Sequence, residues 1–138
     1  MDRQAIIEAY EDVRSDQTPT SWALFGFDDS DKIVLICSGN DNSEFLEKIA
    51  DDQRQFVFVR VTTGDELSKR AKFAFISWIG ENVAALKRAK MTQARSLIKE
   101  VVKSFSAEIS PSDKDEITEE KILQEVKRAG GANYGTGM

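Results

Sequence analysis

The sequence predicts one α/β (α+β) domain, in which a central mixed sheet of about five strands is flanked by two helices on each face. Its 138 residues match the usual size of a single domain. Two segments, 55–62 and 72–79, are apolar on both alternating faces, which is typical of central strands covered by helices on both sides. Segments with helical periodicity precede, separate and follow the predicted strands.

The first half of the chain predicts a helix, a hairpin and a second helix. Apolar residues recur at helical spacing over 3–14. Residues 21–27 alternate and are rich in aromatics, and 33–37 form a continuous apolar run, so we expect two strands joined by the polar turn 28–31. Residues 42–51 predict a short helix before the two central strands.

The second half predicts a long helix over 89–105, a short strand near Glu108 and a final helix. Thr118 is the expected N-cap of that helix, and Gly130 is its expected left-handed stop. We therefore expect a single domain over 1–130, followed by a flexible glycine-rich tail over 131–138. The predicted core stripe of the long helix comprises Met91, Ala94, Ile98, Val101 and Phe105.

Composition excludes several classes of function. There is no histidine, which removes histidine triads, histidine metal sites and histidine pH switches. The one cysteine, Cys37, lies in an apolar run, where we expect a buried packing role and a reducing, cytoplasmic environment. No apolar run reaches the roughly 18 residues that span a membrane, and the polar N-terminus does not resemble a signal peptide.

No residue constellation indicates an enzyme, a cofactor or a metal site. Residues 63–69 look superficially like a phosphate loop but lack its glycine and lysine spacing. The carboxylates of Asp28, Asp29 and Asp31 occupy a predicted turn without apolar surroundings that would raise a pKa. That turn also lacks the spacing and terminal glutamate of an EF-hand. We therefore expect these carboxylates to be solvated.

Nucleic acid is not the expected partner. The net charge is −5. Residues 72–78 resemble the basic and aromatic strand of an RNA-recognition motif but lack its glycine. Both faces of the central strands are predicted to be buried, so no aromatic platform is left for bases to stack on.

The charge distribution favours a protein partner. Residues 69–103 hold nine basic and two acidic residues, a balance of +7 in a chain whose other residues sum to −12. Three candidate binding areas follow. They are the loop cations Lys69, Arg70 and Lys72, the long-helix cations Arg88, Lys90, Arg95, Lys99 and Lys103, and the final-turn cations Lys127 and Arg128. Alternatively, the long-helix cations form an ordinary solvated face, and the final pair complements the helix dipole.

Three stretches resemble the coactosin family. They are Phe56-Val57-Phe58-Val59-Arg60-Val61-Thr62-Thr63-Gly64-Asp65, Ser68-Lys69-Arg70-Ala71-Lys72-Phe73-Ala74 and Trp78-Ile79-Gly80-Glu81-Asn82-Val83. The resemblance continues to Tyr134 and covers nearly the whole chain. It implies the actin-depolymerising-factor homology (ADF-H, gelsolin/cofilin-like) fold.

The resemblance also implies a function. Coactosins bind actin filaments (F-actin) along their sides and regulate filament dynamics without strong severing, and they are associated with opposing barbed-end capping. By position, Lys72 matches the family's principal filament-binding lysine, with Lys69 and Arg70 beside it. Lys127 and Arg128 match the basic end of the last helix, and the long helix with Lys90, Arg95 and Lys99 matches the element that meets the actin cleft. We expect a monomer associated with the cytoplasmic actin cytoskeleton.

Two departures leave alternatives open. Met1-Asp2-Arg3 lacks the phosphorylatable serine of cofilin-like proteins. Lys90-Met91 resembles cofilin's long helix, but Gln93 replaces an expected tyrosine, which leaves binding of monomeric actin (G-actin) open. The alternatives are a cofilin-like filament remodeller that also binds monomers, a cytosolic adaptor and a small enzyme.

Overall fold

The computed structural model describes the backbone of residues 1–64 and 67–136, and the side chains of those ranges as far as residue 130. Asp65 and Glu66 of the loop considered above, and residues 137–138 of the predicted tail, lie outside the described residues. Among the described helices, none is long and apolar enough to cross a membrane.

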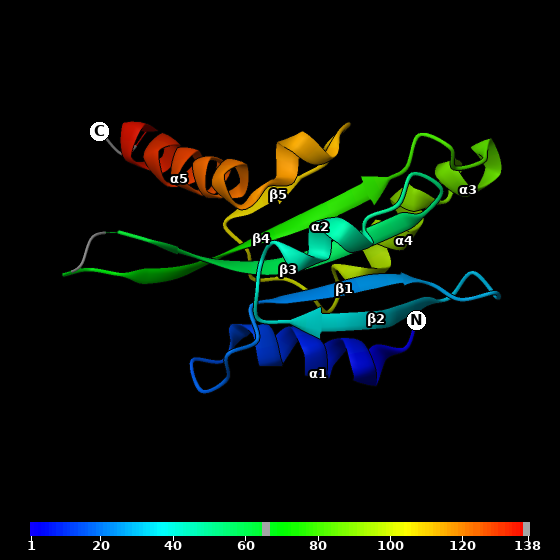
Figure 1. Cartoon of the computed structure of the whole chain (residues 1–138), viewed down its shortest axis with the longest axis horizontal. Coiled ribbons are helices and arrows are strands. Elements are labelled where there is room, and N and C mark those ends of the chain that lie inside the picture. The colour runs from blue at the N-terminus through cyan, green and yellow to red at the C-terminus, as the bar shows by residue number, and fades with distance from the viewer. Residues whose placement is uncertain (65–66, 137–138) are drawn as a thin grey trace.

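A five-stranded mixed sheet forms the centre of the domain, as predicted (Figure 1). Its spatial order is β2-β1-β3-β4-β5. Neighbouring strands pair antiparallel except β4 and β5, which are parallel. The strands are β1 (Trp22–Phe27), β2 (Ile33–Gly39), β3 (Arg54–Thr63), β4 (Arg70–Ile79) and β5 (Ala107–Ile109).

One face of the sheet is covered by α1 (Arg3–Arg14) and α4 (Met91–Ile98). The phenylalanines of the central strands point to this face, and the ring of Tyr10 lies 5.0 Å from that of Phe58. The apolar stripe of the first predicted helix is therefore the side that packs on the sheet, and the predicted alternation of the central strands is confirmed.

The opposite face is covered by α2 (Glu44–Lys48) and α5 (Glu119–Thr136), with the short 3₁₀ helix η1 (Lys114–Ile117) before α5. Valines of β3 pack here, because side chains alternate between the two faces of a strand. Thr118 caps α5 as predicted, since its Oγ1 accepts a hydrogen bond from the Lys121 amide at 3.3 Å. Cys37, predicted to be buried, packs at the margin of this core and is only half-buried.

The prediction of one helix over 89–105 is wrong. A separate short helix, α3 (Ala85–Ala89), precedes α4, and the amide of Lys90 bonds to the carbonyl of Lys87 in a tighter turn between them. Regular helix ends at Ile98, yet Phe105 still packs on Phe75 with ring centroids 5.5 Å apart. The helical spacing of the apolar residues therefore continues past the end of the helix itself.

The final helix is longer than predicted. It continues through Gly130 to Thr136, so the predicted stop at Gly130 is wrong, and Lys127 and Arg128 are not in the last turn. Glycine in a helix interior costs about 1 kcal/mol relative to alanine, which disfavours a helix without preventing it. Complementation of the helix dipole at the last turn therefore does not explain these two cations. The domain boundary at residue 130 stays a prediction.

Candidate functional site

The end of the β3–β4 hairpin extends beyond the rest of the sheet (Figure 1). Pairing of β1 with β3 stops at Trp22 and Val59, and β5 pairs only with residues 74–76 of β4. Residues 61–63 and 70–72 therefore form a two-stranded ribbon with no flanking strand among the described residues. We call this ribbon, together with Lys69, the basic hairpin.

Three cations occupy the basic hairpin. Lys69 and Arg70 are exposed, whereas Lys72 is half-buried beside Val61, its partner in the register. Lys72 lies on the same side of β4 as Ala74, which is the face covered by α5. Within the described residues, none of the three cations has an ion pair. All three cations therefore lie on the part of the β3–β4 hairpin that projects beyond the other strands.

The cations of α5 lie toward the same end of the molecule. The later part of α5 and the basic hairpin project in the same direction, at the left of Figure 1. Lys127 is exposed, and Arg128 bonds to Glu125 at 2.5 Å within the same helix. The structure thus brings the first and third predicted binding areas to one end of the domain.

The cations of the predicted long helix follow the outer edge of β4 instead. Arg88 donates to the carbonyl of Gly80, Arg95 donates to Ser77 Oγ, and Lys99 pairs with Glu108 at 2.8 Å. At about 3.3 Å per residue, the carbonyl that Arg88 contacts lies roughly 26 Å along β4 from Lys72. Because α4 ends at Ile98, Lys103 does not share a helical face with them as predicted.

Lys90 turns toward the β1–β2 hairpin. Its Nζ lies 3.5 Å from Asp31, which also pairs with Lys87 and, most closely, with Arg54. Hydrogen bonding from Arg54 lowers the pKa of Asp31, with a smaller contribution from Lys87, and these effects outweigh desolvation. The prediction of a merely solvated carboxylate is wrong for Asp31, because it is the shared counter-ion of three cations.

Arg54 is a structural residue of this site that the sequence did not predict. Its side chain is only 4% exposed, and its guanidinium lies 3.8 Å from the ring centroid of Phe27. One of its nitrogens, Nη1, is buried without a hydrogen-bond partner among the described residues. The only sequence signal is a charged residue at the start of a strand whose two faces are apolar. Arg54 and Asp31 join the start of β3 to the β1–β2 turn.

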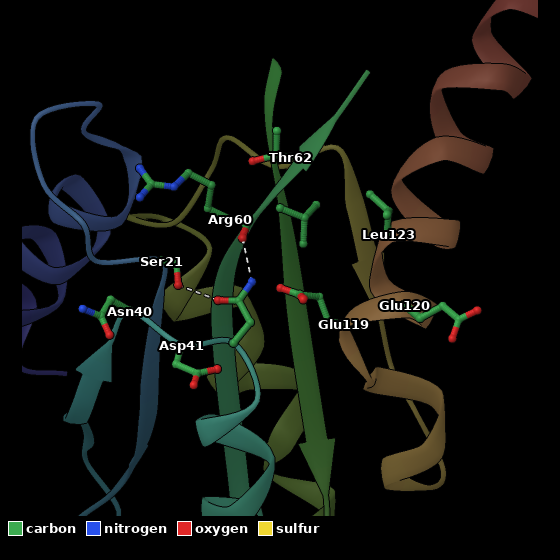
Figure 2. A pocket seen from close by; sticks show the side chains of 10 residues that line it. Ser21, Asn40, Asp41, Arg60, Thr62, Glu119, Glu120 and Leu123 are labelled. Atoms are coloured by element: carbon green, nitrogen blue, oxygen red, sulfur yellow. Dashed lines mark hydrogen bonds between the residues drawn. The ribbon is translucent and has the colours of Figure 1, made fainter. Parts of the chain in front are cut away.

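An open pocket of about 830 Å³ lies between β3, the β2–α2 connection and the start of α5 (Figure 2). Figure 2 shows the guanidinium of Arg60 turned away from Glu119, and it donates to four backbone carbonyls before β1. Asn42 donates to the Arg60 carbonyl at 2.9 Å. Arg60 and Asn42 therefore join β3 to the segment before β1 and to the β2–α2 connection, so their polar groups are engaged within the fold. Among the described residues, no group of three or more acidic, cysteine or histidine side chains could hold a metal.

Comparisons with known proteins agree with this architecture. Residues 1–127 match the model of the cofilin/tropomyosin-type actin-binding protein family. The chain belongs to this family, as a member of its coactosin group. It is 47% identical to the coactosin-like protein of Bos taurus over 134 residues, covering 97% of this chain and 94% of the relative.

Solved coactosin structures share the fold of this family member. The human coactosin-like protein superposes with a TM-score of 0.86 at 44% identity, covering 92% of this chain and 96% of that one. Mouse coactosin, described as an actin filament binding protein, gives a TM-score of 0.80 at 46% identity, covering 99% and 95%. The predicted resemblance and the ADF-H fold are confirmed.

Proposed function

We propose that this coactosin family member binds actin filaments along their sides through the basic hairpin, with Lys72 as the anchor. The observation that carries the proposal is the projecting ribbon with three cations that no described acidic residue neutralises. A partner rich in carboxylates gains most from charges that the fold itself does not use. The similarity to mouse coactosin, an actin filament binding protein, supports the same partner.

The remaining cations extend this surface in two directions. Lys127 and Arg128 add to it at the same end of the domain (Figure 1). Lys90, Arg95 and Lys99 contribute less, because Asp31, Ser77 and Glu108 already engage them. The proposed contact therefore centres on the basic hairpin and weakens toward α4.

The domain is further proposed to act on filaments from their sides. It regulates filament dynamics in the cytoplasm as a monomer, without strong severing and without enzymatic activity, and it opposes barbed-end capping by occupying filament sides. Filament length measured by fluorescence microscopy distinguishes this from a cofilin-like remodeller that also binds G-actin. Shortened filaments, or tight binding of monomers, would favour the remodeller. A pull-down that recovers no actin would favour a cytosolic adaptor.

Co-sedimentation of the Lys72→Ala variant with F-actin tests the anchor. Loss of a central charged contact weakens binding by about tenfold or more. Lys32→Ala is the matched control, because Lys32 is an exposed lysine at the β1–β2 turn, away from the basic hairpin. Lys72→Ala that pellets as well as Lys32→Ala, with both variants melting like the wild type, would refute the assignment.

A further inference from the structure

The edge strand β2 carries an apolar surface that neither the fold nor the proposed filament contact uses. Residues 33–39 contain no charged side chain, and in the described sheet β2 pairs with β1 alone. Sheet edges are commonly protected by charged residues. Ile36, in the middle of the strand, is 52% exposed. At the start of the edge, the Asp2 amide donates to the Ile33 carbonyl at 2.9 Å.

A bulge directs Ile36 into a groove. The register passes from Leu24–Cys37 to Phe25–Leu35, so Ile36 has no partner residue on β1. Its side chain lies over Gly26, where an added Cβ would come within 3.1 Å of it. The adjoining groove of about 450 Å³ is lined by Leu24, Gly26, Phe27, Ile36, Cys37, Lys48, Gln53 and Gln55.

An acidic pocket continues this groove. The two share Phe27 and Gln53 as lining residues, and the second pocket measures about 420 Å³. It contributes three carboxylates, from Asp28, Asp29 and Asp52. Its two cations, Arg54 and Lys87, are both paired with Asp31. A groove that contains Leu24, Phe27 and Ile36 therefore leads into a pocket whose three carboxylates outnumber Lys48, the lining cation without an ion pair among the described residues.

We propose that this combined surface, the β2 groove, is a second protein-binding site for a short extended segment with aliphatic residues next to lysine or arginine. An aliphatic side chain of the segment packs against Ile36 in the groove, and its basic residue meets Asp29 and Asp52 in the adjoining pocket. Charge complementarity selects a basic partner, because the adjoining pocket has three carboxylates, whereas the groove has one cation, Lys48, among its lining residues.

The bulge in β2 disfavours a second copy of the chain as the occupant. The bulge at Ile36 interrupts the continuous ladder that antiparallel pairing of β2 with its own copy requires.

The β2 groove goes beyond the proposed function because it leaves the filament surface free. β2 is one edge of the sheet, whereas β4 and β5 form the other side. The domain can therefore hold a basic partner segment while the basic hairpin contacts a filament.

The test uses the ¹⁵N-labelled full chain and a nonapeptide probe, acetyl-Lys-Lys-Ser-Ile-Thr-Val-Thr-Lys-Lys-amide. We expect amide shifts concentrated at Ile36, Cys37, Gln53 and Asp29. The same peptide with glutamate in place of every lysine is expected to bind at least about tenfold more weakly. Ile36→Lys is expected to weaken binding of the lysine peptide by about tenfold or more, because the apolar contact is lost.

Further variants make the test specific. Leu97→Lys changes another exposed apolar residue, on α4 outside the groove, and is expected to leave binding unchanged. The double variant Asp29→Asn and Asp52→Asn keeps Ile36 and is expected to weaken binding about threefold. Lys72→Ala is expected to leave peptide binding intact, which separates this inference from the filament contact.

Three outcomes would overturn the inference. They are equal binding of the lysine and glutamate peptides, shifts that map elsewhere, and unchanged binding by Ile36→Lys. Sedimentation velocity gives a fourth. A dimer that forms with rising concentration and is lost in Ile36→Lys would assign the groove to a second copy of the chain.

Discussion

The two hairpins of the sheet carry charged residues of the same types and use them in opposite ways. At the β1–β2 turn, Asp31 is the counter-ion of Arg54, Lys87 and Lys90, so those charges are engaged within the fold. At the basic hairpin, Lys69, Arg70 and Lys72 have no ion pair among the described residues. A cation therefore indicates a binding surface only where no acidic residue of the fold pairs with it.

The largest contrast is expected from Arg54→Ala. Removing one member of a largely buried ion pair lowers the free energy of unfolding by about 3 kcal/mol. Urea unfolding at neutral pH measures it. Lys87→Ala is the matched control, because Lys87 pairs with the same carboxylate from an exposed position and should cost at most about 1 kcal/mol. Equal costs for the two variants would contradict the structural role of Arg54.

The pH dependence of the stability of Asp31→Asn tests the ion pairs at the β1–β2 turn. Asp31 has a positive φ of 65°, which asparagine tolerates, so the backbone is expected to be retained. Arg54 lowers the folded-state pKa of Asp31, so its stabilisation is full above the ordinary carboxyl pKa of about 3.9 and is lost as pH falls through the folded value. Wild type should therefore be the more stable at pH 7, and the difference should vanish in acid. A difference that does not shrink as the pH falls below about 3.9 would contradict this.

A smaller effect is expected at the margin of the filament surface. Lys127→Ala should weaken co-sedimentation with F-actin about threefold, as expected for one exposed charge. Lys121→Ala is the control, because Lys121 is an exposed lysine nearer the start of the same helix. If both variants weaken pelleting equally, the effect reflects net charge and not position near the basic hairpin.

The smallest effect is expected along β4. Lys99→Ala should change filament binding by less than about twofold, because Glu108 already holds Lys99 at 2.8 Å. The same co-sedimentation assay measures it. A loss greater than that of Lys127→Ala would move the proposed surface from the basic hairpin to the edge of β4.

Much of the fold could be predicted because alternation and helical spacing depend on which face is buried. The alternation of Phe56 and Phe58 with Val57 and Val59 identified a strand buried on both faces. The long helix could not be bounded in the same way. Val101 remains buried and Phe105 packs on the core after the helix has ended at Ile98. The helical spacing of these apolar residues therefore made the predicted helix too long.

The sequence could predict which cations belong to the candidate site, but not which of them form ion pairs within the fold. Sequence order placed Lys69, Arg70 and Lys72 on a loop that leaves the sheet. It could not reveal that Lys90 turns to Asp31, because that contact joins residues brought together only by tertiary packing. The predicted helix end at Gly130 was wrong because local helix propensity is a weak signal, and a helix can continue through glycine.

Protection of lysines from acetylation on assembled filaments tests the central claim most directly. Mass spectrometry of the wild-type chain, free and bound to F-actin, reports each lysine without a substitution. Lys69, Lys72 and Lys127 are expected to be protected on filaments, while Lys32 and Lys48 react as in the free chain. Protection of Lys32 or Lys48 with unchanged labelling of Lys72 would contradict a filament contact at the basic hairpin.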